Sequence, residues 1–142
     1  MFKAETIVRV RYGETDQMGV VYYGNYALYY EVARVEAMRN LGMSYRELEE
    51  NGIMMPVLEL GCKFIKPARY DDELRIRVII PELPITRLYF QYEVFNNSNN
   101  ELLNTGHTTL VFIDKTTNRP CRCPADFYQR LARHFPENVS LK

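Results

Sequence analysis

Residues 11–34 read RYGETDQMGVVYYGNYALYYEVAR, and they join a turn that holds one carboxylate, Asp16, to a long helix expected from about Gly24-Asn25. The first backbone N–H groups of a helix have no internal partner and carry the positive end of its dipole. They can therefore stabilise a carbonyl oxygen that becomes negative. Asp16 precedes Tyr23 by seven residues and is placed to act on the carbon of the same carbonyl. The stretch therefore predicts a site for attack on a carbonyl group.

The helix is predicted over residues 25–41, with Asn25 as its N-cap and Gly42 at the position where a left-handed residue ends a helix. Its apolar residues span a wide arc, which indicates a helix surrounded by other structure. One apolar stripe consists of Tyr26, Tyr29, Tyr30, Ala33, Ala37 and Leu41, and a second side adds Leu28, Val32 and Val35. We interpret the tyrosines as core and interface residues.

The remaining chain alternates between strand and turn patterns. Strands are predicted at residues 5–12, 54–65, 73–80, 88–95 and 102–113, of which the second is interrupted by Pro56 and Gly61, and residues 96–100 form a hairpin turn. A short helix is predicted at residues 44–51, where Ser44 and Glu47 fit a capping box. A terminal helix is predicted from Pro124, because three apolar residues recur there at helical spacing: Phe127, Leu131 and Phe135.

These elements predict a single α+β domain over residues 1–142. Strands joined by hairpins are mostly antiparallel, and a lone long helix with a broad apolar face needs a curved sheet to bury it. We therefore expect an antiparallel sheet of about five strands wrapped around a long central helix. The outer side of this sheet still carries apolar residues such as Phe95, which predicts association with a second copy.

The composition excludes several classes of protein. Lys+Arg and Asp+Glu both number 18, so no bulk charge draws the protein to nucleic acid or to a membrane. No apolar run reaches the length of a membrane span, and residues 1–8 lack the apolar segment of a signal peptide, so we expect a cytoplasmic protein. The cysteines Cys62, Cys121 and Cys123 give no disulfide framework and no metal-site spacing to the two histidines. We expect neither a metal nor a cofactor.

The sequence DQMGVVYY (residues 16–23), followed by NY (25–26) and YEVAR (30–34), resembles the signature of the hot-dog-fold acyl-CoA thioesterases, in particular the 4-hydroxybenzoyl-CoA thioesterase type. KPA (66–68) and DD (71–72) resemble a turn between sheet strands of that family. The resemblance implies a hot-dog fold, Asp16 as the catalytic carboxylate and a thioester carbonyl near the backbone N–H of Tyr23. It also implies sites between two subunits, in a homodimer or a homotetramer.

The predicted reaction is hydrolysis of a small or medium acyl-CoA to the free acid and coenzyme A. Asp16 serves either as a general base for water or as a nucleophile that forms a mixed anhydride. Because a thiolate is a good leaving group, no strong general acid is required. The Tyr at position 23 stands where related enzymes often carry His, so it bears on substrate preference rather than on activity.

Substrate contacts are predicted at the motif and at the basic residues that follow it. The motif and its flank contribute Tyr12, Gly19, Val21 and Tyr22. The phosphates of coenzyme A need cations, for which Lys63, Lys66 and Arg69 are candidates, although each also fits a solvated basic residue. Glu59 shares a strand face with Lys63 and either positions the acyl group or pairs with Lys63.

Other functions fit the sequence less well. A dehydratase of the same fold relies on a histidine at the active helix, whereas His107 and His134 lie far downstream. An acyl-carrier-protein thioesterase and a non-catalytic protein that binds acyl-CoA or a carrier protein are the alternatives. Intact Asp16 favours an enzyme over a binding protein.

Overall fold

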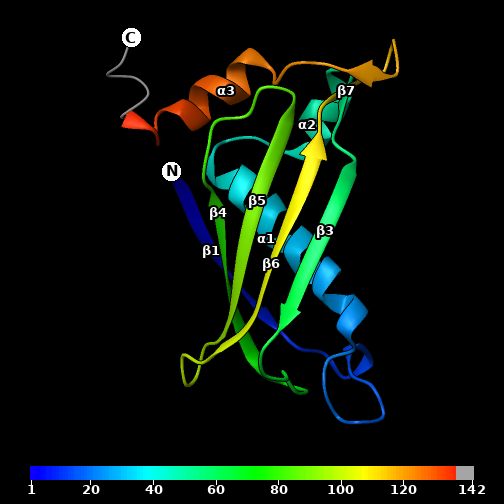
Figure 1. Cartoon of the computed structure of the whole chain (residues 1–142), viewed down its shortest axis with the longest axis vertical. Helices are drawn as coiled ribbons and strands as arrows, with labels where there is room; N and C mark the ends of the chain where they lie inside the picture. The colour runs from blue at the N-terminus through cyan, green and yellow to red at the C-terminus, as the bar shows by residue number, and fades with distance from the viewer. Residues whose placement is uncertain (137–142) are drawn as a thin grey trace.

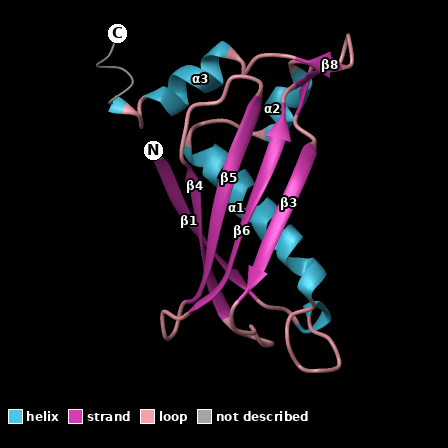
Figure 2. Ribbon diagram, in the orientation of Figure 1, coloured by secondary structure: helices cyan, strands magenta, loops and turns pink. Residues whose placement is uncertain are grey.

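The computed structural model describes residues 1–136, and its main feature is a long helix, α1 (Tyr26–Asn40), that crosses one face of a five-stranded antiparallel sheet (Figure 1). The strand order is β1-β4-β5-β6-β3. The strands are β1 (Phe2–Arg9), β3 (Val57–Phe64), β4 (Glu73–Ile80), β5 (Arg87–Asn96) and β6 (Leu102–Val111). The predicted α+β architecture, with about five strands around a central helix, is confirmed (Figure 2).

Smaller elements lie at the end of the sheet where β6 finishes. They are α2 (Tyr45–Glu50), α3 (Ala125–Ala132) and a second sheet of β2 (Ile53–Met54), β7 (Ile113–Asp114) and β8 (Arg119–Pro120). The stretch predicted as a strand over residues 54–65 with interruptions at Pro56 and Gly61 is two strands, because the chain breaks at Met55-Pro56 but continues as β3 through Gly61. Pro56 has no N–H to donate, and β2 pairs with β7 instead of joining the main sheet.

The start of α1 also differs from the prediction. Asn25 does not cap the helix with its side chain, and a 3-10 helical turn, Tyr23–Asn25, precedes α1. The Asn25 amide Nδ2 donates instead to the carbonyl oxygen of Glu14 at 2.8 Å, which ties the helix start to the preceding loop. The other end is as predicted, because Gly42 has a left-handed φ of 81° that only glycine adopts without strain.

The core lies between α1 and the sheet. The predicted apolar stripe of α1 is buried throughout, and the apolar alternation of β4 and β5 faces it. Phe127 of α3 closes the end of this core against Phe112, with ring centroids 5.9 Å apart. Among residues 1–136, no helix is long and apolar enough to cross a membrane.

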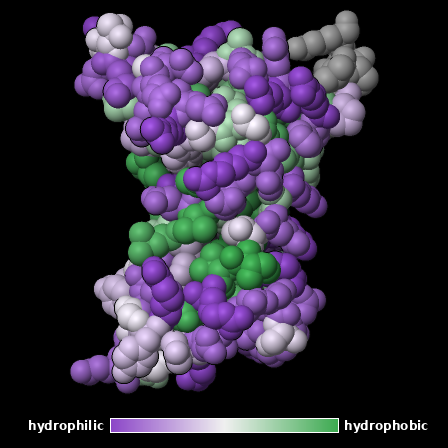
Figure 3. Space-filling model, turned by 180° about the vertical axis from the view of Figure 1, so that it is seen from behind, coloured by the Kyte–Doolittle hydropathy of each residue, from purple (hydrophilic) through white to green (hydrophobic). Residues whose placement is uncertain are grey.

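Exposed apolar surface lies on the helix side of the molecule rather than at Phe95. The Phe95 ring is covered by the guanidinium groups of Arg75 and Arg77, 4.7 and 5.3 Å from its centroid. On the opposite face, hydrophobic residues gather across the middle of the surface (Figure 3). Large exposed apolar side chains on α1 and β3 are Leu28, Val32, Val57, Leu58, Leu60 and Phe64.

Candidate active site

A tight turn in the loop between β1 and α1 presents Asp16. The Asp16 backbone N–H donates to the Val20 carbonyl at 2.9 Å, and the Gly19 N–H donates to the Asp16 carbonyl at 3.0 Å. Gly19 has a φ of 79°, which glycine adopts without strain. The carboxylate oxygen Oδ1 accepts a hydrogen bond from the Met18 N–H at 2.9 Å. Among the residues that the structure describes, nothing donates to the second oxygen, Oδ2.

The chain enters α1 with two backbone donors unused. The Tyr22 N–H donates to the Glu14 carbonyl and the Asn25 N–H donates to the Tyr22 carbonyl, both at 2.9 Å. Between them, the N–H groups of Tyr23 and Gly24 have no acceptor within residues 1–136. Donors at a helix start are suited to bind an oxygen that gains negative charge.

Asp16 and Tyr23 line the same crevice, which has a volume of about 290 Å³. Its other walls are apolar or aromatic, and it runs between the loop, the start of α1 and the end of β3. The lining residues are Asp16, Met18, Val20, Val21, Tyr23, Tyr26, Phe64, Ile65, Lys66 and Pro67. A larger hollow of about 740 Å³ adjoins it, and Asp16 belongs to both. The carboxylate therefore stands between two spaces that can hold the two sides of a substrate.

Glu14 anchors this loop, and the sequence analysis missed it. Its carboxylate accepts hydrogen bonds from the Arg11 N–H at 2.9 Å, the Arg11 Nε at 3.0 Å and the Tyr29 hydroxyl at 2.9 Å. Burial acts to raise the pKa of Glu14, but these bonds outweigh it and hold the pKa below the usual value. The signal that the sequence offered for Glu14 was a second acid two residues before Asp16.

Several predicted contact residues surround Asp16. Tyr12 and Gly19 line the larger hollow, where the ring of Tyr12 packs edge-on to Tyr70 with centroids 5.7 Å apart. Val21 is buried in the crevice wall, and its N–H donates to the Ala68 carbonyl at 2.8 Å. The structure therefore places these three residues around Asp16.

Tyr22 and two of the basic residues lie at the edge of the same region. The Tyr22 ring packs on Tyr23 with centroids 4.6 Å apart. Lys66 lines the crevice, and its Nζ pairs with Glu101 at 3.2 Å. Arg69 is bridged to Val20 through the backbone, and within the described chain its guanidinium forms no ion pair.

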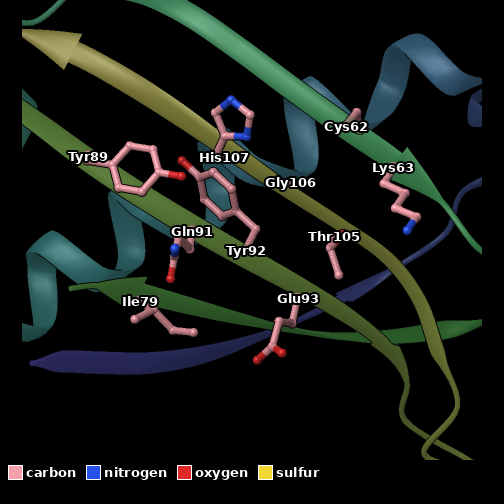
Figure 4. Close-up of a pocket in the computed structure, with 10 residues that line it drawn as sticks. All are labelled: Cys62, Lys63, Ile79, Tyr89, Gln91, Tyr92, Glu93, Thr105, Gly106 and His107. Atoms are coloured by element: carbon pink, nitrogen blue, oxygen red, sulfur yellow. The ribbon is translucent and has the colours of Figure 1, made fainter.

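Glu59 and Lys63 are not brought to the crevice. Lys63 lies with His107, Tyr89 and Gln91 around a hollow of about 410 Å³ on the face of the sheet away from α1 (Figure 4). Glu59 pairs with His107 Nε2 at 3.2 Å rather than with Lys63. Within one chain, neither residue therefore reaches a carbonyl group held at Asp16. Within residues 1–136, no group of His, Cys, Asp or Glu side chains is placed to hold a metal ion.

One crevice is lined by the Asp16 carboxylate and by Tyr23, whose N–H has no acceptor in the described chain, and two such groups are suited to act on a carbonyl group. The sequence profile of the thioesterase-like superfamily matches residues 10–131, and the chain belongs to this family. The acyl-CoA thioester hydrolase YbgC of Escherichia coli is 34% identical over 117 residues, covering 82% of this chain and 87% of YbgC.

Solved structures show the same fold. The DHNA-CoA thioesterase from Staphylococcus aureus aligns with a TM-score of 0.90 and 34% identity over 100% of this chain and 97% of its own. A mutant 4-hydroxybenzoyl-CoA thioesterase aligns with a TM-score of 0.80 and 23% identity over 90% of this chain and 97% of its own. The predictions of a hot-dog fold and of a thioester hydrolase are confirmed.

Proposed function

We propose that this protein hydrolyses acyl-CoA thioesters, with Asp16 acting at the carbonyl carbon and the Tyr23 N–H holding the carbonyl oxygen. The observation that carries the proposal is the shared crevice, which Asp16 and Tyr23 both line. The Gly24 N–H is a second candidate donor, because it also lacks an acceptor in the described chain. The names of YbgC and of the Staphylococcus aureus enzyme support acyl-CoA as the substrate class.

The chemistry needs little beyond these groups. As a general base, Asp16 Oδ2 takes a proton from water while the oxygen of that water bonds to the carbonyl carbon. The C–S bond then breaks, and the thiolate leaves and takes up a proton. As a nucleophile, Asp16 bonds to the carbonyl carbon, and the C–S bond breaks to release the thiolate and leave a mixed anhydride; water then opens the anhydride, which frees the acid and restores the Asp16 carboxylate. In both routes the Tyr23 N–H stabilises the negative oxygen, and one such donor is worth roughly 10²–10³ in rate.

Recognition of coenzyme A is proposed to involve basic residues beside Asp16. Arg69 and Lys66 are the candidates for its phosphates, because both flank the crevice or its adjoining hollow and Arg69 forms no ion pair in the described chain. Tyr12, Gly19 and Tyr22 would contact the remaining parts of the substrate. Glu59 and Lys63 could contribute only from a second subunit or at a distance from the reacting carbon.

A homodimer or homotetramer is proposed from the surface of β3. This strand ends the sheet order and, within residues 1–136, pairs only with β6. Leu58, Leu60 and Phe64 are 52%, 43% and 52% exposed on it. An exposed apolar edge strand favours pairing with another chain. We further propose a single-domain cytoplasmic enzyme, with an acyl-carrier-protein thioester as the alternative substrate.

The test is thiol release from a panel of acyl-CoA and acyl-carrier-protein thioesters by the wild type and Asp16→Asn. Loss of Asp16 as the general base or the nucleophile should lower kcat by a factor of roughly 10²–10⁴. Asp126→Asn is the matched control, because Asp126 lies on α3 and pairs with Arg130 at 3.2 Å. Wild-type activity in Asp16→Asn would overturn the role of Asp16. Tight binding of coenzyme A without thiol release from any thioester would instead favour a binding protein.

A further inference from the structure

We infer that Phe64 limits the length of the acyl group that the crevice accepts. This inference rests on the proposed function, because it takes the apolar crevice beside Asp16 as the acyl site. Phe64 is the last residue of β3, and its ring lies between that strand and the start of α1. Its role would be in substrate specificity rather than in the chemical step.

The Phe64 ring forms one wall of the crevice. Its centroid is 5.4 Å from that of Tyr26 and 6.5 Å from that of Tyr23, and both pairs are edge-to-face. Such contacts fix the orientation of an aromatic ring. Tyr23 also provides the free N–H for the thioester carbonyl of the substrate. An acyl chain that extends from this carbonyl along β3 therefore soon meets the Phe64 ring.

Behind Phe64, β3 stays in contact with α1. Side chains on one face of a strand recur every second residue, so Cys62 and Leu60 follow Phe64 on the side that faces α1. The Cys62 sulfur lies 3.1 Å from the hydroxyl of the buried Tyr30, so β3 and α1 close against each other at this second level. The two levels of contact between β3 and α1, Phe64 with Tyr26 and then Cys62 with Tyr30, are about 6 Å apart.

With Phe64 in place, the crevice ends at the first level, and its volume of about 290 Å³ suits a short chain or a single ring. Replacing Phe64 by Ala adds the volume of the removed ring to the crevice, up to the level that Tyr30 and Cys62 close, and makes room for additional methylene groups. Each methylene buried in this space should raise kcat/KM by about fourfold. The ratio of long-chain to short-chain kcat/KM should therefore rise more than tenfold in Phe64→Ala.

The experiment compares kcat/KM for straight-chain acyl-CoAs from acetyl to dodecanoyl in the wild type, Phe64→Ala and Phe95→Ala. Phe95→Ala makes the same chemical change on the opposite face of the sheet and should keep the wild-type profile. Phe64→Leu retains part of the side chain and should give a smaller shift in the same direction. If Phe64→Ala does not fold, the chain-length profile of Phe64→Leu provides the test.

The outcomes separate this inference from the proposed function. A wild type that hydrolyses none of the thioesters refutes the proposed function itself. An active wild type whose chain-length profile is unchanged by folded Phe64→Ala or Phe64→Leu overturns only the role of Phe64. A wild type that already prefers the longest chains, or an equal shift in Phe95→Ala, also overturns it.

Discussion

Replacing Glu14 by Ala should destabilise the protein strongly, although Glu14 lies in a loop. Its side chain is only 14% exposed and accepts three hydrogen bonds. Loss of the carboxylate removes the acceptor of the buried Tyr29 hydroxyl, which costs about 1–3 kcal/mol. Loss of the charge-assisted bond from the Arg11 N–H adds a similar amount. The ion pair to the Arg11 side chain adds little, because that side chain is 83% exposed.

The expected total is about 3 kcal/mol, which lowers Tm by roughly 10 °C in a protein of this size. Thermal unfolding followed by circular dichroism measures it. Glu36→Ala is the matched control, because Glu36 pairs with Arg39 on the exposed side of α1 and is 43% exposed. We expect that control to change stability by less than about 1 kcal/mol. Equal Tm values for Glu14→Ala and Glu36→Ala would refute the anchoring role of Glu14.

The pH dependence gives a second readout of the same contacts. The pKa of Glu14 is lowered in the folded protein, so its charge contributes stability above the unfolded pKa of about 4.3. That contribution is lost as the pH falls through the folded pKa. The difference in unfolding free energy between the wild type and Glu14→Gln should therefore be largest near neutral pH and shrink below about pH 4. A difference that is independent of pH would show that the charge of Glu14 is not involved.

Two further predictions concern half-buried positions. Gly106→Ala should cost about 1–3 kcal/mol, because its Cβ would collide with the Tyr30 hydroxyl, while the Tyr30 ring is stacked 4.2 Å from Tyr92. Gly13→Ala has open space and is the control for urea unfolding, and equal losses would contradict this account. Burial raises the pKa of Cys123 to about 12, so its thiol should resist iodoacetamide at pH 8 until urea unfolds the protein. Mass spectrometry of the alkylated protein measures this, and equal labelling before and after unfolding would count against it.

The local pattern of the chain predicted most of the fold. The structure confirms the alternation in residues 73–80 and the apolar stripe of α1. An element with one buried face can place its apolar side chains on that face only if they recur with the period of a strand or of a helix. The prediction failed where one residue mattered more than the pattern. The pieces on either side of Pro56 join different sheets, and Asn25 turned its side chain to Glu14 instead of capping α1.

The sequence by itself placed Asp16 and Tyr23 in one motif, because only seven residues separate them and a helix start must follow. Tertiary structure decided what surrounds them. The crevice needs Phe64 from the end of β3 and Lys66 just after it, and sequence spacing does not reveal that approach. It also decided that Lys63 and Glu59 face the opposite side of the sheet, since strand parity fixes which residues share a face but not which face meets the helix.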